Sequence, residues 1–228
     1  MFPLRNIFKV LRELNLFQTL RFCFHYFQFK EAVKLPILVF NKVHVEKMGG
    51  GIFIDNHPIK TGLIVFGKKN LGGTDSRCVR SAWEVSGRIV VKGHVSIGLG
   101  CYVSVGQNGV LTLGDKLGIT GNTMLDCSSD ITIGSDCLFS WDVMLMDSDY
   151  HPIFDAQSHE INKPKPIQIG NHVWIGCGTK VLKGSRVSDN TVIAAGSLLS
   201  GSFDERNVIL AGRGNEVRIV KDNITWKK

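Results

Sequence analysis

The segment DSDYHPIFD, residues 147–155, places one histidine among three aspartates. A neutral imidazole can take a proton from a hydroxyl group, and a carboxylate on the other ring nitrogen fixes the tautomer that leaves the first nitrogen free to accept. His151 is therefore a candidate general base, and Asp147 or Asp149 is the candidate residue that orients it. Both aspartates stay open at this point, because spacing within a loop does not fix which one reaches the ring.

A six-residue repeat of apolar residues surrounds this segment. Downstream, the repeat occupies Ile169, Ile175, Val181, Val187, Ile193 and Leu199. Upstream, it forms the triplets Val91, Ile97 and Val103, then Leu113, Ile119 and Leu125, then Ile133, Phe139 and Leu145. This period is typical of a solenoid with three six-residue faces per coil, in which the apolar side chain of each face points inward. It predicts three parallel sheets around a dry core, whereas a β-sandwich would show two-residue alternation in uneven segments.

The repeat stops where the histidine occurs. If the register continued past Leu145, the next inward positions would be His151, Gln157 and Lys163. A dry core does not accept these polar side chains, and the repeat resumes only at Ile169. The sequence therefore predicts a protruding loop at about residues 147–166 that carries His151 outward.

The sequences VWIGCGTKVLKGSRVSDNTVIAAGSLLSG and NVILAGRGNEVRIVKDNITW resemble the carboxy-terminal signature of the hexapeptide-repeat acyltransferases. The resemblance covers about residues 89–226, and it is greatest for the maltose and galactoside O-acetyltransferase branch and for the sugar O-acetyltransferases of capsular and other polysaccharide gene clusters. It implies a left-handed parallel β-helix, an exception to the usual right-handed crossover. It also implies a homotrimer with active sites between neighbouring subunits, acetyl-CoA as the acyl donor, and a catalytic histidine in a loop beside the donor groove, where His151 stands.

The resemblance carries over to further positions. Trp174 matches an aromatic residue of the acceptor and donor groove, and Cys177 takes the place of a small residue whose backbone faces the cofactor. Ala195 matches a position whose backbone amide contacts coenzyme A, and Ser200 matches a threonine there. Asn122 lies near an asparagine that contacts the acceptor sugar, and the alternative is a corner asparagine that tolerates left-handed backbone geometry.

The chain departs from the family pattern near its end. Gly201 replaces a lysine, and Glu216 takes the position of a basic residue that can contact the cofactor phosphate. Arg213, Arg218 or Lys221 would have to supply that cation.

A zinc site is not expected from the histidine spacing. A carbonic anhydrase class built on the same type of prism carries a histidine pair five positions apart. Five positions after His94 stands Leu99, and five after His172 stands Cys177. The sequence therefore offers no histidine pair of that kind and predicts no metal site.

The first 30 residues read as an amphipathic helical segment. Apolar residues at helical spacing are Leu4, Ile7, Phe8, Leu11 and Leu14, with Arg5, Lys9 and Arg12 on the opposite face. The segment is too charged to span a membrane. It either packs on the main domain or a neighbouring subunit, or lies in a membrane interface as a peripheral contact. The expected organisation is this segment over residues 1–35, the β-helix over 36–210, and a tail with a short helix over 211–228.

Composition sets the remaining expectations. The chain has 43% hydrophobic residues and a formal net charge of +7, which argues against a largely disordered protein and favours an anionic membrane or a phosphorylated ligand as a partner. Six cysteines are scattered without a CxxC pair, as expected of reduced thiols in the cytoplasm. The sequence predicts a cytoplasmic O-acetyltransferase, free or peripheral at the inner face of the membrane, that acetylates a sugar, nucleotide-sugar or lipid-linked glycan and has no nucleic-acid partner. The alternative is an inactive solenoid that serves as a scaffold.

Overall fold

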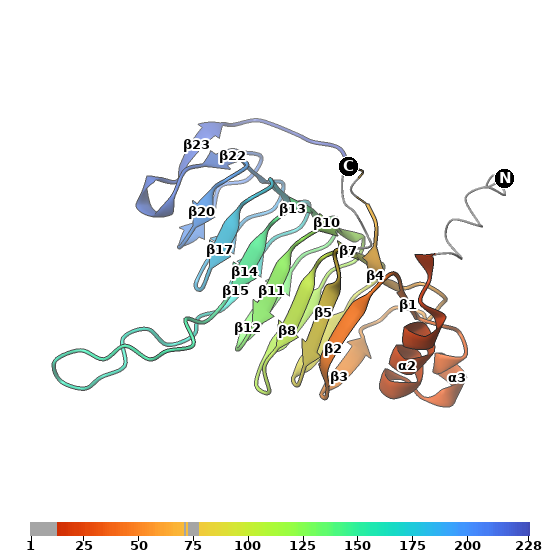
Figure 1. The fold of residues 1–228 in the computed structure, drawn as a ribbon. Coiled ribbons are helices and arrows are strands. Elements are labelled where there is room, and N and C mark those ends of the chain that lie inside the picture. Colours follow the sequence, from red (N-terminus) through yellow and green to blue (C-terminus); the bar gives the residue numbers. More distant parts are fainter. Residues whose placement is uncertain (1–12, 71, 73–77) are drawn as a thin grey trace.

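A computed structural model of the chain describes residues 13–70, 72 and 78–228 (Figure 1). Its main body is a three-sided prism of parallel strands, wound as a left-handed β-helix, which confirms the predicted fold class. The strands fall into three sheets, here named the first, second and third face. From β1 to β22, successive strands visit the faces in that order, so each face collects every third strand along this part of the chain.

The strands of the first face are β1 (Ile37–Val39), β4 (Ile64–Lys68), β7 (Val95–Leu99), β10 (Leu117–Gly121), β13 (Leu138–Trp141), β16 (Trp174–Ile175), β19 (Val192–Ile193), β22 (Ile209–Ala211) and β23 (Arg218–Lys221). Those of the second face are β2 (Val43–Met48), β5 (Ser81–Val85), β8 (Tyr102–Val105), β11 (Met124–Cys127), β14 (Met144–Met146), β17 (Lys180–Leu182) and β20 (Leu198–Leu199). Those of the third face are β3 (Gly51–Ile54), β6 (Arg88–Val91), β9 (Val110–Leu113), β12 (Asp130–Ile133), β15 (Ile167–Ile169), β18 (Arg186–Val187) and β21 (Ser202–Phe203).

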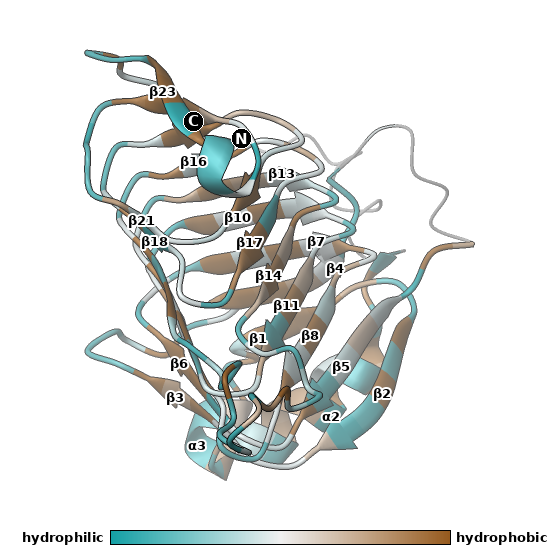
Figure 2. Ribbon diagram, turned by 90° about the vertical axis from the view of Figure 1, so that its left-hand side faces the viewer, coloured by the Kyte–Doolittle hydropathy of each residue, from teal (hydrophilic) through white to brown (hydrophobic). Residues whose placement is uncertain are grey.

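The six-residue repeat lines the inside of the prism. On the second face, Val103, Leu125, Leu145, Val181 and Leu199 stand in register on five successive strands, and each is at most 2% exposed. Each such buried side chain contributes about 1.5–3 kcal/mol of hydrophobic stabilisation. Figure 2 shows the result, because the brown hydrophobic colour concentrates on the strands and the turns between them are mostly white or teal.

Left-handed backbone conformations turn the chain at all three edges of the prism. The first edge joins the first face to the second, the second edge joins the second to the third, and the third edge joins the third to the first. Residues with positive φ at the first edge are Asn41, Gly100, Asn122, Asp142, Gly178 and Gly196. Those at the third edge include Lys116, Asp136, His172, Asn190 and Asn207, and those at the second edge include Gly50, Gly184 and Gly201. Glycine, asparagine and aspartate adopt this conformation at the lowest cost, which explains the small polar residues that interrupt the repeat.

Two helices close one end of the prism. Helix α2 (Leu16–Tyr26) begins at Asn15, whose side chain accepts the Gln18 N–H at 3.1 Å, and α3 (Phe29–Ala32) follows after a short turn. The buried Phe22 ring lies 5.2 Å from that of Trp83, so the helices extend the core beyond the first coil. No helix of the described residues is long and apolar enough to cross a membrane. Four of the five apolar positions on which the helix prediction rested, Leu4, Ile7, Phe8 and Leu11, lie outside the described residues.

The opposite end of the prism differs from the expected helical tail. The helix is reduced to one 3-10 turn, η1 (Gly214–Glu216), and the chain continues as β23, antiparallel to β22. Arg218–Lys221 contains two β-branched residues, Ile219 and Val220, which favour a strand. Residues 222–228, here named the C-terminal strap, then run back along the prism toward its middle (Figure 1).

Candidate active site

The predicted protrusion corresponds to a loop that leaves the prism after β14 and returns at β15 (Figure 1). The coil resumes in register, since Ile131 pairs with Ile167 and Ile133 with Ile169 across the third face. The loop folds on itself as a narrow ribbon, in which the Ile161 N–H donates to the Ile153 carbonyl at 2.8 Å. Its base is closed by the Lys165 N–H, which donates to the Asp147 carbonyl at 3.1 Å.

His151 lies exposed near the base of this loop. Its backbone N–H donates to the Asp149 carbonyl at 2.7 Å, and its own carbonyl accepts from Asn162 Nδ2 at 2.9 Å. Within the part of the chain that the structure describes, the imidazole itself forms no hydrogen bond or ion pair. The ring is therefore accessible to a ligand or to a second polypeptide.

Asp147 does not orient His151. Its side chain is completely buried, with Oδ1 accepting the Ser128 N–H at 2.7 Å and Oδ2 accepting the Ser129 N–H at 2.8 Å. Both oxygens are thus used to satisfy two backbone amides at the second edge, one coil earlier. The proposed catalytic role of Asp147 is wrong for this reason, and its role is to hold the point where the loop leaves the prism.

Asp149 acts on His151 through the backbone. Its Oδ2 accepts from Lys183 Nζ at 2.6 Å and from Asn162 Nδ2 at 2.9 Å, and that same Asn162 amide also donates to the His151 carbonyl. The Lys183 hydrogen bond, followed by that from Asn162, lowers the pKa of Asp149 because both stabilise the charged carboxylate. Asn162 and Lys183 were missed in the sequence, because they lie 13 and 34 residues from Asp149 in no recognisable pattern.

Tyr150 fixes the other side of the loop base. Its backbone is left-handed, with φ at 63°, and its hydroxyl donates to the carboxylate of Asp126 on β11. Burial is the main cause of a raised pKa for Asp126, and burial followed by the nearby Asp126 raises the pKa of Tyr150 to about 12. The neutral phenol therefore remains a donor at neutral pH, and it anchors the residue next to His151 on the second face.

The predicted donor residues gather at the first edge of the prism. Cys177 follows β16 and Ala195 follows β19, and the two turns are joined by the Gly196 N–H, which donates to the Cys177 carbonyl at 2.8 Å. Ala195 is exposed, and its own amide makes no hydrogen bond to any described residue. Asn122 lies two coils earlier on the same edge, with φ at 49°, which is the corner geometry that its alternative interpretation requires.

The other predicted donor residues divide between two edges. Exposed Arg213 follows β22 at the first edge, where it bridges to Leu198. Exposed Ser200 follows β20 at the second edge, as the His151 loop follows β14. One strand of the second face, with its flanking residues, separates the two edges by roughly 15–20 Å. A single chain therefore does not bring His151 together with Cys177 and Ala195.

An aromatic stack supports Trp174. This residue begins β16 on the first face, is 38% exposed, and donates from Nε1 to Ser140 Oγ at 3.2 Å. The ring of Trp226, from the C-terminal strap, lies 5.9 Å from the Trp174 ring and stacks on His172 at 4.2 Å. Trp226 was missed in the sequence, although an aromatic residue within a polar terminal segment is a usable signal for docking.

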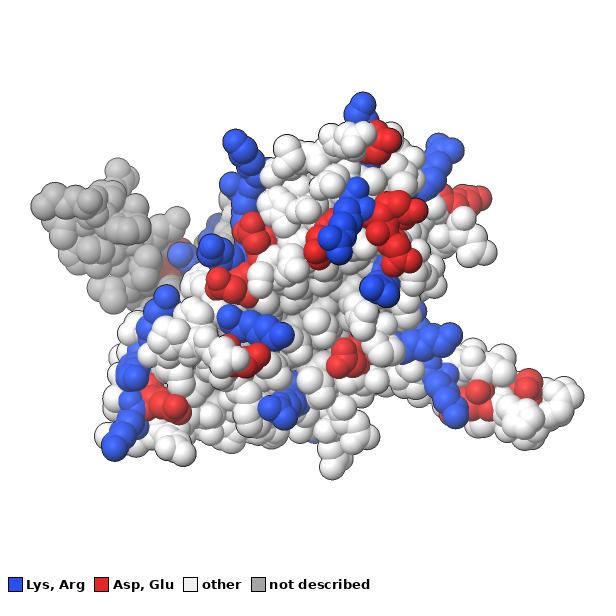
Figure 3. Space-filling model, turned by 180° about the vertical axis from the view of Figure 1, so that it is seen from behind, with Lys and Arg blue, Asp and Glu red and all other residues white. Residues whose placement is uncertain are grey.

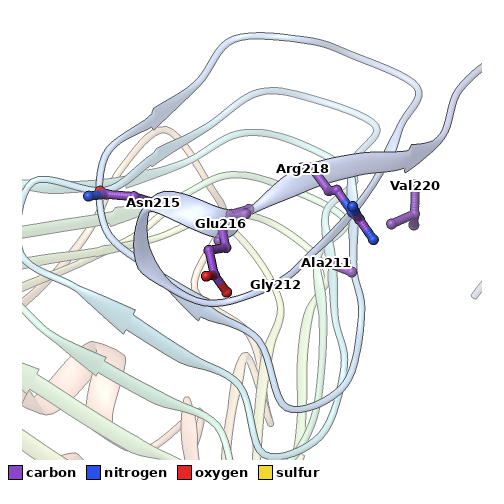
Figure 4. Close-up of a pocket in the computed structure, with 7 residues that line it drawn as sticks. Ala211, Gly212, Asn215, Glu216, Arg218 and Val220 are labelled. Atoms are coloured by element: carbon purple, nitrogen blue, oxygen red, sulfur yellow. The ribbon is translucent and has the colours of Figure 1, made fainter.

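The hairpin of β22 and β23 lines an open hollow of about 610 Å³ at the end of the prism (Figure 4). Arg218 and Glu216 both line it, and Figure 4 shows the guanidinium on the side of Ala211 and the carboxylate on the side of Gly212. Of the three cations considered in the sequence, Arg218 is the one that lines this hollow.

Metal-binding and nucleic-acid-binding features were sought as well. Residues 13–70, 72 and 78–228 contain no group of three or more His, Cys, Asp or Glu side chains that could hold a metal ion. On the side shown in Figure 3, basic and acidic side chains are intermixed over much of the surface, and several Lys and Arg side chains line its lower left edge.

Comparison with known proteins shows where the repeat recurs. The family model described as bacterial transferase hexapeptide (six repeats) matches residues 166–201. An uncharacterized 24.8 kDa protein in the cps region of Klebsiella pneumoniae is 30% identical over 206 residues, which cover 90% of this chain and 87% of that protein. A polysialic acid O-acetyltransferase of Escherichia coli O1:K1 / APEC is 34% identical over 139 residues, 60% of this chain and 42% of its own length.

Two further similarities involve named acetyltransferases. The galactoside O-acetyltransferase of Escherichia coli strain K12 is 33% identical over 116 residues, 49% of this chain and 53% of that protein. The crystal structure of the polySia specific acetyltransferase NeuO is 24% identical with a TM-score of 0.46, over 85% of this chain and 79% of that one. The chain spans less than half the length of the two polysialic acid O-acetyltransferases among its curated relatives, at 42% and 31%.

Proposed function

Because the chain belongs to the hexapeptide-repeat family of bacterial transferases, we propose that it is an O-acetyltransferase acting in polysaccharide or glycoconjugate biosynthesis. It transfers acetyl from acetyl-CoA to a hydroxyl of a sugar. The observation that carries the proposal is the loop that leaves the coil register and exposes an unpaired His151 imidazole. The relatives named as sugar O-acetyltransferases support the reaction, and the cps region of the Klebsiella relative supports the setting.

The proposed reaction needs one base and one oxyanion site. The His151 imidazole accepts the proton of the sugar hydroxyl while that oxygen attacks the thioester carbonyl carbon. A C–O bond forms, and the resulting oxyanion is stabilised by a backbone N–H, for which the unpaired amide of Ala195 is the candidate. Collapse of the intermediate breaks the C–S bond, and the imidazolium returns the proton to the departing sulfur of coenzyme A. The products are the acetylated sugar and free coenzyme A.

The proposed assembly is a homotrimer in which the first edge of one chain meets the second edge of the next. Such a contact places His151 and Ser200 of one chain against Cys177 and Ala195 of its neighbour, and it closes into a three-membered ring when successive chains are related by a rotation of 120°. The second face supports this arrangement. Its outward residues Tyr102 and Met124 are neighbours in register and are 52% and 36% exposed, as expected of a face that turns toward other subunits.

Coenzyme A and the compartment follow from the same proposal. Exposed Arg213 at the first edge and Arg218 in the hairpin hollow are the proposed cations for the donor phosphates. They replace the basic residue of the family pattern, whose position Glu216 occupies in this chain. The buried thiols of Cys101, Cys127 and Cys137 are not joined in disulfides, which suits the reducing cytoplasm where acetyl-CoA is available.

The test is acceptor-dependent release of coenzyme A. The purified chain is incubated with acetyl-CoA and a panel of hexoses, galactosides, amino sugars, sialic acids and lipid-linked saccharides, and the free thiol is measured together with the mass of the product. We expect one acceptor class to raise thiol release well above slow hydrolysis and to gain one acetyl group. Absence of both acceptor-dependent release and coenzyme A binding by calorimetry would overturn the proposal.

A further inference from the structure

The helical cap of the prism has an apolar outer face. Its inner side is buried through Thr19, Phe22, Cys23, Phe27 and Ala32. On its outer side, six large apolar side chains are 40–73% exposed, namely Leu16, Phe17, Leu20, Phe24, Phe29 and Val33. This set is named the apolar cap face. The inner side of the cap packs on the prism core. Burial of the apolar outer side therefore requires a second partner.

The apolar cap face is continuous. Leu16, Leu20 and Phe24 follow each other at four-residue spacing along one side of α2. The rings of Phe24 and Phe29 lie 5.9 Å apart, so the stripe passes from α2 to α3 without interruption. Single exposed apolar residues are common on soluble proteins, whereas a contiguous patch of this kind marks an interaction surface.

The position of the cap limits what can cover this face. Figures 1 and 2 place α2 and α3 at one end of the prism and the β22–β23 hairpin at the other. Chains that join edge to edge lie side by side, so their end faces remain outside the contact. Three parallel prisms would present their three cap faces on the same side of the assembly.

The charges around the apolar cap face distinguish between a second copy of the cap and a lipid bilayer as the partner that covers it. Three exposed cations accompany the apolar side chains, namely Arg21 on α2, Lys30 on α3 and Lys34 just after α3. The one carboxylate of these two helices is the half-buried Glu31. A second copy of the cap would bring these three cations against their equivalents. A lipid bilayer with anionic headgroups accepts both phenylalanine side chains and cations.

We propose that the apolar cap face is a peripheral membrane-binding surface that selects anionic lipids. The phenylalanine and leucine side chains enter the boundary between headgroups and acyl chains, and the three cations contact lipid phosphates. Three such faces on one assembly bind cooperatively through effective concentration, even when each alone binds weakly. The trimer and a lipid-linked acceptor rest on the proposed function, but lipid binding by the cap itself does not.

The experiment is vesicle co-sedimentation of the full chain, without acetyl-CoA or acceptor. Vesicles of phosphatidylglycerol with phosphatidylethanolamine are compared with vesicles of phosphatidylcholine. The test variant carries Phe17→Ser, Phe24→Ser and Phe29→Ser. The matched control carries Ile219→Ser and Val220→Ser, which are 41% and 50% exposed at the opposite end of the prism. A charge variant carries Arg21→Gln, Lys30→Gln and Lys34→Gln, and thermal melts confirm that all variants are folded.

We expect the full chain and the control to bind anionic vesicles, and the phenylalanine variant to lose binding by roughly tenfold or more. The charge variant should lose the preference for anionic over zwitterionic vesicles, and salt should weaken the binding of the full chain. Equal binding by the full chain and the phenylalanine variant would overturn the proposal. So would the absence of vesicle binding together with a larger assembly that the phenylalanine substitutions dissociate, since the face would then join copies of the chain. Neither result depends on catalysis, so failure here is distinct from failure of the acetyltransferase proposal.

Discussion

Asp149 is linked to the backbone of His151 and not to its imidazole, because the Nδ2 atom of Asn162 lies 2.9 Å from both the Asp149 carboxylate and the His151 carbonyl oxygen. Lys183, from the turn after β17, holds the same carboxylate at 2.6 Å. The base of the loop is thus fixed relative to the prism while the ring stays accessible. This division between a fixed backbone and a free ring suits a base whose second contacts come from substrate and a neighbouring chain.

Replacing His151 by alanine tests the base directly. We expect turnover with the true acceptor to fall by roughly 10² to 10⁴, the range typical of a lost general base. Coenzyme A affinity and melting temperature should not change, because the side chain is outside the core. His159→Ala is the matched control, since His159 is an exposed histidine of the same loop. Turnover near that of the unmodified chain would remove His151 from the mechanism.

Removing the hydrogen bonds that link Asp149 through Asn162 to the His151 carbonyl should misplace His151 without removing its side chain. For Asp149→Ala we expect roughly a tenfold lower kcat with little change in KM, because positioning of the base affects the transition state most. Limited proteolysis of the loop should accelerate in parallel. A lower kcat without faster cleavage would assign Asp149 a direct role instead.

The hydrogen bonds of the Asp149 carboxylate also predict that the order of the loop depends on pH. The pKa of Asp149 is lowered in the folded chain, so its contribution is present above the ordinary aspartate range and is lost as pH falls through the depressed value. The rate at which an acid-tolerant protease cleaves the loop should therefore stay constant as the pH falls from neutral to about 4 and should rise only below about pH 4. The Asp149→Asn variant should show no such rise. A rise centred near pH 6 would point to a histidine and contradict the assignment.

Asp147 should matter for stability and not for orienting the base. Asp147→Ala leaves two backbone N–H groups without acceptors at a buried corner, which we expect to cost about 2–5 kcal/mol of unfolding free energy. Asp155→Ala is a fitting control, because Asp155 also accepts from two backbone N–H groups but stands in the outer part of the loop. Its cost should stay near about 0.5 kcal/mol. Urea unfolding compares the two, and equal costs would show that the buried corner is not special.

Mixed trimers can show whether one site uses two chains. A variant with His151→Ala damages the second edge, and one with Ala195→Trp obstructs the first. If the site lies between chains, mixing the two inactive variants in equal amounts should restore about a quarter of the sites, as random assembly of a closed ring requires. Mixed trimers that form but stay inactive would place the site within one chain.

The C-terminal strap should position Trp174. For Trp226→Ala we expect a several-fold higher KM with a smaller change in kcat, since Trp226 supports a ring and contacts no reacting atom. Trp226→Phe should restore most of the lost affinity because it keeps an aromatic partner for His172. Tryptophan fluorescence on coenzyme A addition provides a second readout. Equal losses in the alanine and phenylalanine variants would argue against support by stacking.

The parts of the molecule that the sequence predicted are those controlled by local spacing. Ile97, Ile119 and Phe139 are buried because a coil of three six-residue faces repeats along the chain. The position of the loop followed from the same register, since polar residues fell on inward positions. These predictions needed no knowledge of which segments meet in space.

The parts that were missed depend on contacts between distant residues. Lys183 reaches Asp149 from 34 residues away, and Trp226 reaches His172 from 54. Asp147 looked catalytic because it stands near His151 in the chain, but its buried carboxylate satisfies amides of the preceding coil. Spacing along the chain does not report which of several nearby polar groups the fold uses for its own hydrogen bonds.

The closed base of the loop has a consequence for how this chain can vary. The prism resumes its register at Ile167, and the Lys165 amide already meets the Asp147 carbonyl across the base. Because the coil register closes beneath residues 152–161, we expect that their length and composition can change without a compensating change in any coil. If His151 is the base proposed above, changes in these residues alter the surroundings of the acceptor and leave the core unchanged.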